Sequence, residues 1–178
     1  MRRLALAFLT VCLGVAPAGA ALKVGDVAPG FTAQAALAGA PFTFTLADAL
    51  KKGPVVVYFY PKAFTQGCSL EAHAFADAMD KFTALGASVI GVSHDGIADL
   101  ERFSIEKCSN KFPVASDGDQ HIMKAYDSVL AKNPDFANRT SYLIAPDGHV
   151  LAEYTDMDYS KHVDTMLAAL ASWKAGQH

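Results

Sequence analysis

Cysteine is scarce in this chain, and neither sign of charge dominates. The 178 residues include three cysteines, 15 Lys+Arg and 18 Asp+Glu, for a formal net charge of -3. Three cysteines are too few for a disulfide scaffold, and a chain without a basic excess has no broad nucleic-acid-binding face. Because 52% of the residues are hydrophobic and no low-complexity tract occurs, a disordered chain is excluded as well. A single globular domain remains.

A long, mostly apolar segment lies near the start of the chain. Residues 4–16 are mostly apolar, Arg2 and Arg3 precede them, and the small residues 18–20 follow. This order is typical of a secretory signal peptide with its cleavage site, and the segment is too short for a membrane-spanning helix. We therefore predict a cleavable signal peptide at residues 1–20; a buried N-terminal helix is the alternative.

Cleavage after Ala20 leaves a mature domain of residues 21–178. Cys12 is then removed with the signal, and the mature chain keeps only Cys68 and Cys108. We expect this domain to be exported, to the periplasm, and to have no membrane contact after cleavage. Since exported proteins meet an oxidising environment, the two remaining thiols form a disulfide, serve catalysis, or both.

Strand and helix patterns alternate along the mature chain. Residues 21–36 have the turn signals of an extended lead-in, and the apolar, β-branched run at 55–60 is typical of a central strand. The expected elements are strands at 42–46 and 55–60, a helix at 68–85 with Leu70 and Phe75 on its apolar face, a strand at 88–93, a helix at 97–109, a strand at 113–116, a helix at 120–126, a hairpin of 141–145 with 149–154, and a helix at 161–173. This order fits an α/β fold of three layers.

Cys68 occupies a position that favours reactivity. The central strand ends at Tyr60, a short loop follows, and Cys68 falls in the first turn of the next predicted helix. A helix N-terminus offers unpaired N–H groups and positive partial charge, which favour a thiolate over a thiol. The thiolate is the nucleophilic form, so we predict that Cys68 is a reactive cysteine.

The spacing Pro61-x-x-x-Thr65-x-x-Cys68, with Glu71 one turn later, resembles the motif of the peroxiredoxins. The likeness is greatest to the bacterioferritin-comigratory or Q-type subgroup, and it extends over roughly 24–173. Further segments that carry it are Gly91–Asp95, Phe112–Asp117 and Arg139–Ile144. The resemblance implies a thioredoxin-like three-layer α/β/α sandwich with a central mixed sheet. It also implies a thiol peroxidase that reduces hydrogen peroxide and organic hydroperoxides without metal, haem or flavin.

The resemblance assigns a role to each matching residue. Cys68 would attack the peroxide and become a sulfenic acid, and Thr65 would hold the peroxide through its hydroxyl. Arg139 would stabilise the thiolate and the charge on the departing oxygen, Glu71 would orient Arg139, and Pro61 would shield the thiolate from water. Taken singly, each of these residues also has an ordinary structural role, such as a helix cap for Thr65.

The resolving cysteine is less well defined. Many members of the subgroup carry it five residues after the peroxidatic cysteine, where this chain has His73, which we expect to be solvated. Cys108 is the remaining candidate, and a disulfide with Cys68 needs their Cα atoms within about 7 Å, so the Cys68 helix would have to unwind locally. Alternatively, Cys108 packs in the core beside Phe103. An external thiol would then reduce the sulfenic acid.

The reductant implied by the resemblance is thioredoxin or another thiol donor, and a monomer is favoured over a dimer. One competing function is an exported thioredoxin-fold disulfide oxidoreductase, which would need a Cys-x-x-Cys motif where Cys68 is followed by Ser69, Leu70 and Glu71. Another is a redox-inactive binding module of the same fold, against which the intact Thr65, Cys68 and Arg139 argue.

The six histidines show no paired spacing typical of a metal site.

Overall fold

Seven strands form one sheet in the computed structural model, which describes residues 21–177. The predicted signal peptide at 1–20 lies outside the described residues. The elements are β1 (Thr32–Leu37), β2 (Ala40–Thr45), α1 (Leu46–Leu50), β3 (Val55–Phe59), α2 (Gln66–Ala84), β4 (Ser88–Ser93), α3 (Ile97–Glu106), β5 (Val114–Ser116), α4 (His121–Ala125), β6 (Thr140–Ile144), β7 (Val150–Thr155), the 3-10 helix η1 (Tyr159–Lys161) and α5 (His162–Ala175). The strand order across the sheet is β2-β1-β5-β4-β3-β6-β7.

The sheet is mixed, as the sequence predicts. Strand β4 runs parallel to both β3 and β5, while the pairs β1–β2, β1–β5, β3–β6 and β6–β7 are antiparallel. Strand β3 lies near the middle of the sheet, and all five of its residues are buried. Its carboxyl end leads directly into the loop that carries Cys68.

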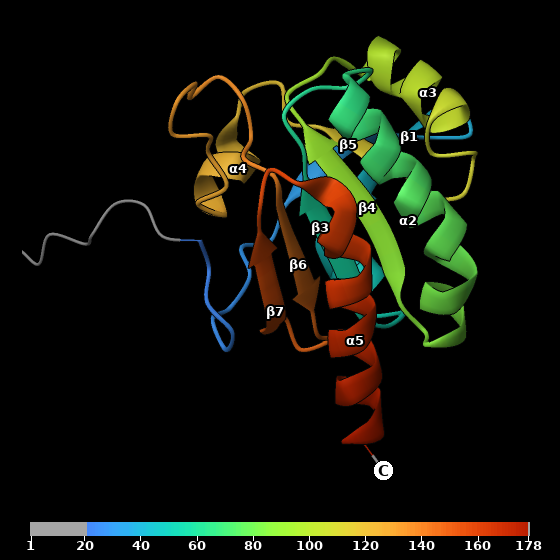
Figure 1. The fold of residues 1–178 in the computed structure, drawn as a ribbon, viewed down its shortest axis with the longest axis vertical. Coiled ribbons are helices and arrows are strands. Elements are labelled where there is room, and N and C mark those ends of the chain that lie inside the picture. The colour runs from blue at the N-terminus through green and yellow to red at the C-terminus, as the bar shows by residue number, and fades with distance from the viewer. Residues whose placement is uncertain (1–20, 178) are drawn as a thin grey trace, which may run out of the picture.

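Alternating residues of β3 build two separate cores, one on each face of the sheet. Val56 and Tyr58 pack with residues of α2, α3 and α5, whereas Val55 and Phe59 pack with residues of α1 and α4. Figure 1 shows α2 and α5 together in front of the sheet. This alternation follows from the two-residue period of a strand, and it confirms the three-layer α/β/α sandwich.

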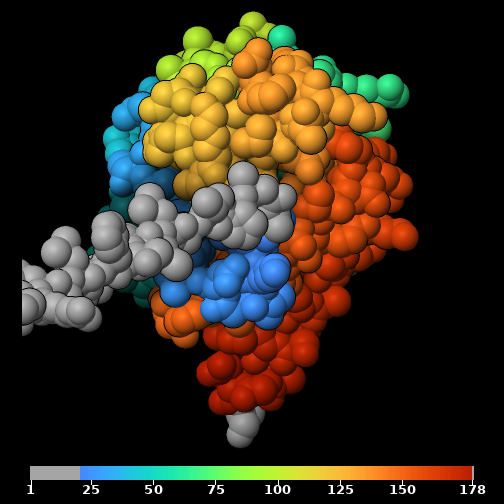
Figure 2. Space-filling model, turned by 90° about the vertical axis from the view of Figure 1, so that its left-hand side faces the viewer, coloured from blue at the N-terminus to red at the C-terminus, as the bar shows by residue number. Residues whose placement is uncertain are grey.

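The early chain is more ordered than its sequence indicates. Within the expected lead-in, Thr32–Leu37 forms β1, because its backbone pairs with β2 on one side and β5 on the other. Strand β2 confirms the expected strand at 42–46, although its residues are mostly exposed. Further upstream, the Gly25 amide donates to the Val150 carbonyl (2.8 Å), so the first described residues lie along β7. Figure 2 shows these residues in blue between the yellow and orange segment that follows β5 and the red C-terminal helix.

Two helices differ in detail from the expectation. Helix α3 ends at Glu106 rather than at residue 109, and the left-handed φ values of Ser109 (51°) and Asn110 (61°) show that the backbone has left the helical path. In α2, Leu70 is 41% exposed, so its expected burial was wrong, and the expected solvation of His73 is met only in part because this residue is half-buried. Among the residues that the structure describes, no helix is long and apolar enough to cross a membrane.

Candidate active site

Cys68 lies in the first turn of α2, as predicted, and its side chain is only 1% exposed. The helix begins at Gln66, and Thr65 at the N-cap position has extended backbone (φ -68°, ψ 153°). This change from extended to helical backbone directly after β3 places the Cys68 sulfur at the N-terminal end of the helix. The thiol is free. Because Cys68 lies in the first turn, the positive end of the 19-residue helix is beside its sulfur.

Arg139 reaches Cys68 from the opposite side of the site, just before β6. Its Nη2 atom donates to the Cys68 sulfur over 3.5 Å, its Nη1 atom donates to the Glu71 carboxylate, and its Nε atom donates to the Met157 carbonyl over 3.0 Å. All three nitrogen atoms of the guanidinium thus have a partner. The planar group is held in one orientation, with one edge directed at the sulfur.

Glu71 lies one helical turn after Cys68 and has no exposed surface. Burial raises the pKa of its carboxyl to about 8, while Arg139 acts in the opposite direction. Its Oε2 atom accepts from Arg139, and its Oε1 atom has no hydrogen-bond partner among the described residues. The structure therefore brings Cys68, Glu71 and Arg139 together, although Arg139 is far from the other two in the chain.

Thr65 and Pro61 line the loop in front of Cys68. The Thr65 side chain donates its hydroxyl hydrogen to the Lys62 carbonyl (2.9 Å) and does not cap α2. Pro61 is half-buried, whereas Thr65 is exposed. Within residues 21–177, no hydrogen bond joins either residue to Cys68. Thr65 is instead oriented by the loop itself, with its oxygen open to solvent.

Two further residues hold this loop. The buried carboxylate of Asp95 accepts from the Ala63 amide (2.7 Å) and from the Ser93 hydroxyl (2.8 Å). Phe64 has a left-handed φ of 64°, and its ring packs edge-on against Phe103 of α3 with a centroid distance of 5.3 Å. Sequence reasoning missed both roles. An acidic residue two positions after a buried strand was the available signal for Asp95.

The comparisons with known proteins agree with this geometry. The family model described as AhpC/TSA family matches residues 24–153. The chain belongs to this family. Peroxiredoxin Bcp of Escherichia coli (strain K12) is 34% identical over 151 residues, which cover 82% of this chain and 94% of that protein. Peroxiredoxin Q, chloroplastic, of Sedum lineare is 34% identical over 125 residues, or 70% and 67% of the two chains.

Solved structures give the same result. Peroxidoxin BcpB from Mycobacterium tuberculosis superimposes with a TM-score of 0.77 at 28% identity, covering 85% of this chain and 97% of the other. Peroxiredoxin Q from Xanthomonas campestris gives a TM-score of 0.69 at 29% identity, covering 79% and 90%. The expected peroxiredoxin identity and thioredoxin-like α/β fold are therefore confirmed. The protein is a thiol peroxidase.

The second cysteine of this peroxiredoxin is also free and has no exposed surface. Cys108 follows the end of α3 and packs in the same core as Cys68, with the buried Tyr60 near both thiols. Burial raises the pKa of the Cys108 thiol, which keeps it protonated and unreactive while it stays in this position. Any reaction between Cys108 and Cys68 needs a rearrangement that exposes it.

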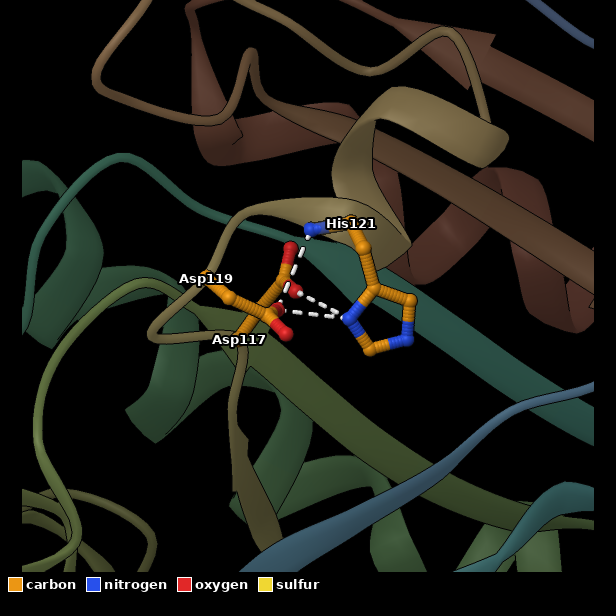
Figure 3. A group of neighbouring side chains, drawn as sticks. All are labelled: Asp117, Asp119 and His121. Atoms are coloured by element: carbon orange, nitrogen blue, oxygen red, sulfur yellow. Dashed lines mark hydrogen bonds and ion pairs between the residues drawn. The ribbon is translucent and has the colours of Figure 1, made fainter.

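One cluster in the peroxiredoxin has the residue types of a metal site. Asp117, Asp119 and His121 place one ligand atom each within 4.8 Å of one another at the start of α4 (Figure 3). The spacing of the histidines does not indicate this cluster, because it contains only one histidine. However, the Asp117 oxygens accept from the first-turn amides of Ile122 (2.9 Å) and Met123 (2.8 Å), while Asp119 bonds the exposed His121 (2.6 Å). These contacts assign Asp117 to capping the helix.

Proposed function

We propose that this peroxiredoxin reduces hydrogen peroxide and organic hydroperoxides at Cys68. The observation that carries the proposal is the Arg139 guanidinium, held by Glu71 and Met157, with its Nη2 atom 3.5 Å from the buried Cys68 sulfur. A fixed positive charge beside a sulfur at a helix N-terminus stabilises the thiolate, which is the form that attacks peroxides.

The reaction at Cys68 is a displacement at oxygen. The thiolate attacks the terminal peroxide oxygen, the S–O bond forms as the O–O bond breaks, and the sulfur is oxidised to sulfenic acid by two electrons. The other oxygen departs with a proton as water or alcohol. Arg139 stabilises the negative charge that develops on this departing oxygen, because its guanidinium is already oriented toward the sulfur.

Thr65 supplies the contact that aligns the substrate. Its hydroxyl hydrogen is engaged by the Lys62 carbonyl, so the oxygen is available to accept a hydrogen bond from the peroxide O–H. Pro61, half-buried beside it, limits the access of water to the thiolate. With these roles, a peroxide bound between Thr65 and Arg139 would present its terminal oxygen to the Cys68 sulfur.

Cys68→Ser tests the reaction, and Cys108→Ser is the matched control, since both change a buried cysteine in the same core. With a small dithiol as reductant, we expect Cys68→Ser to lose peroxide turnover and Cys108→Ser to keep it, because a small thiol can reduce the sulfenic acid directly. Peroxide consumption by Cys68→Ser at the wild-type rate would overturn the assignment.

We also propose that Cys108 is the resolving cysteine. The sulfenic acid of Cys68 would react with the Cys108 thiol to give a disulfide and water. Support comes from the two consecutive left-handed residues, Ser109 and Asn110, that follow Cys108, because such backbone is strained for residues other than glycine and favours local opening. Intact mass after one equivalent of hydrogen peroxide is the test. Loss of two hydrogens supports the disulfide, and a stable added oxygen on Cys68 contradicts it.

The reductant that closes the cycle is a thiol donor, and we propose thioredoxin or a protein of the same chemistry. Two electrons are needed for each peroxide, and a dithiol delivers both by thiol–disulfide exchange. A coupled assay with thioredoxin, its reductase and NADPH tests this proposal. Steady NADPH oxidation on peroxide addition supports it, whereas turnover with small thiols alone would point to a different donor.

We propose that the peroxidase is exported and acts in the periplasm. The basic start, apolar run and small residues of positions 1–20 support this location. Expression of the full chain in a Gram-negative host, followed by cell fractionation and N-terminal sequencing, provides the test. We expect a periplasmic protein beginning at Ala21; an uncleaved cytoplasmic protein would contradict the proposal.

We further propose that the enzyme acts as a monomer. The residues around the reactive sulfur, Pro61, Thr65, Glu71 and Arg139, all come from one chain, so the site needs no second copy. Light scattering coupled to size-exclusion chromatography measures the mass in solution. A stable dimer under reducing conditions would contradict this proposal.

A further inference from the structure

The loop that carries Thr65 is attached to the neighbouring strand by one buried carboxylate. Asp95 follows β4, which runs parallel to β3, so both strands end at the same edge of the sheet (Figure 1). Its Oδ2 atom accepts from the Ala63 amide in the loop after β3 (2.7 Å) and from the Ser93 hydroxyl (2.8 Å). Its main-chain carbonyl accepts from the Ser116 hydroxyl (2.7 Å). Asp95 is therefore anchored to β4 and β5 while it holds the loop.

A single peptide group connects Asp95 to Thr65. The Ala63 N–H, which donates to Asp95, and the Lys62 carbonyl, which accepts from the Thr65 hydroxyl (2.9 Å), belong to the same peptide bond. This peptide bond is trans and planar, so its N–H and C=O point in opposite directions. When Asp95 fixes the direction of the N–H, it also fixes the direction from which the carbonyl meets the Thr65 hydroxyl.

The bond to Asp95 also strengthens the bond to Thr65. A peptide group whose N–H donates to a carboxylate is polarised, and its carbonyl becomes a better acceptor, because consecutive hydrogen bonds reinforce one another. The Thr65 hydroxyl hydrogen is then held at the Lys62 carbonyl. The lone pairs of the Thr65 oxygen remain available to accept from the peroxide O–H.

Without the Asp95 contact, two features of the loop favour a different arrangement. Phe64, between Ala63 and Thr65, has a left-handed φ of 64°, which is strained for a residue with a side chain. Thr65 occupies the N-cap position of α2, where a threonine oxygen ordinarily accepts from an amide of the first turn, but its side chain makes no such bond. A relaxed loop would let the Thr65 oxygen cap the helix and would withdraw it from the peroxide.

We propose that Asp95 is a positioning residue for the peroxidase reaction: through the 62–63 peptide group it orients the Thr65 hydroxyl that aligns the peroxide with Cys68. This inference rests on the proposed reaction at Cys68. In the described part of the chain, the Asp95 side chain bonds Ala63 and Ser93 and makes no hydrogen bond to Cys68 or Arg139. Asp95 therefore acts on the alignment of the substrate and leaves the stabilisation of the thiolate unchanged.

Two reagents separate alignment of the peroxide from reactivity of the thiolate. Hydrogen peroxide carries the O–H group that Thr65 accepts. Methyl methanethiosulfonate reacts with the same thiolate, forming an S–S bond as methanesulfinate leaves, but it has no hydrogen-bond donor for Thr65 to orient. Quenched-flow mass spectrometry with peptide mapping gives the rate constant of each reaction at Cys68.

We expect Asp95→Ala to slow sulfenic acid formation about tenfold, the loss expected for one misaligned hydrogen bond, without lowering the rate with methyl methanethiosulfonate. Asp95→Asn keeps an acceptor for the Ala63 amide but loses the charge, so its loss should be about threefold. In the Thr65→Val background, Asp95→Ala should cause no further loss, because its effect passes through the Thr65 hydroxyl.

Asp117→Asn is the matched control. Asp117 is also a buried carboxylate that accepts two hydrogen bonds, but its donors are the first-turn amides of α4. This variant should lose stability and keep both rate constants at Cys68. A tenfold loss with peroxide in Asp117→Asn as well would show that any weakened buried carboxylate disturbs the site, and would overturn the specific role of Asp95.

The outcomes also separate this inference from the proposed reaction. If the wild type forms no sulfenic acid at Cys68, the reaction itself is wrong. If the wild type reacts and Asp95→Ala has the same rate with peroxide, only the role of Asp95 is wrong. Equal losses with both reagents, or a full loss in the Thr65→Val background, would reduce Asp95 to a structural residue. Should Asp95→Ala not fold, Asp95→Asn with and without Thr65→Val decides.

Discussion

Glu71 and Arg139 form a buried hydrogen-bonded pair although 68 positions separate them in the chain. Glu71 belongs to α2, which also carries Cys68, and Arg139 precedes β6 on the other side of β3. The pair therefore joins two parts of the fold beside the Cys68 sulfur. Removal of either partner leaves the other side chain buried without this hydrogen bond, which typically destabilises a protein by about 1–3 kcal/mol.

Arg139→Lys should lower the rate constant of sulfenic acid formation by about 100-fold, even though the charge is kept. A lysine ammonium is a point charge and cannot bond Glu71, Met157 and Cys68 in the orientations of the guanidinium. Stopped-flow measurement under pseudo-first-order peroxide gives the rate constant. The exposed Arg102→Lys is the control, and equal rates for the two variants would contradict the orienting role of Arg139.

Glu71→Gln should change how stability depends on pH. Since the pKa of Glu71 rises from 4.5 to about 8 on folding, the folded chain binds this proton more tightly than the unfolded chain. The contribution to the free energy of unfolding is fully present below pH 4.5 and is lost as the pH rises toward 8. The free energy of unfolding of the wild type, minus that of Glu71→Gln, should therefore decrease as the pH rises from 4.5 toward 8.

Urea unfolding of both chains at a series of pH values measures that difference. Glu106→Gln, at an exposed position at the end of α3, is the matched control and should give a difference that is flat with pH. A flat difference for Glu71→Gln as well would show that Glu71 is ionised throughout the range in the folded protein.

Phe64→Ala should speed disulfide formation after the sulfenic acid has formed. The Phe64 ring packs on Phe103, with the Arg102 guanidinium 4.9 Å above it, and so ties the active-site loop to α3, which precedes Cys108. Loss of this half-buried ring removes about 1–2 kcal/mol of contacts that hold the closed arrangement. Quenched-flow mass spectrometry follows the step. Phe44→Ala, at a half-buried ring on the other face of the sheet, should leave its rate unchanged; acceleration by both variants would indicate general destabilisation.

Asp117→Ala should lower the free energy of unfolding by about 2 kcal/mol without changing the rate at Cys68. Its carboxylate is the partner of two amides at the start of α4, and the alanine variant leaves both without an acceptor. The exposed Asp119→Ala should stay within about 0.5 kcal/mol of the wild type. Urea unfolding measures both, and equal losses would contradict the capping role of Asp117.

Local sequence signals determined much of this protein. The apolar run at 55–60 predicted the central strand, and the loop and helical pattern after it predicted Cys68 in a first turn, because those features depend on neighbouring residues. The motif around Pro61, Thr65 and Cys68 identified the family for the same reason. Strand β1 was missed, since its alanine-rich residues form a strand only through pairing with β2 and β5.

Only the tertiary structure determined which side chains contact Glu71 and how the pKa values around Cys68 are shifted. Arg139 and His162 are distant from Cys68 in sequence, and their contacts with Glu71 arise only when the residue before β6 and the start of α5 come beside α2. Burial, which shifts the pKa of Glu71 upward and that of His162 downward, is a property of the assembled core and leaves no trace in residue spacing. The sequence therefore determines the position of Cys68, and the fold determines its electrostatic environment.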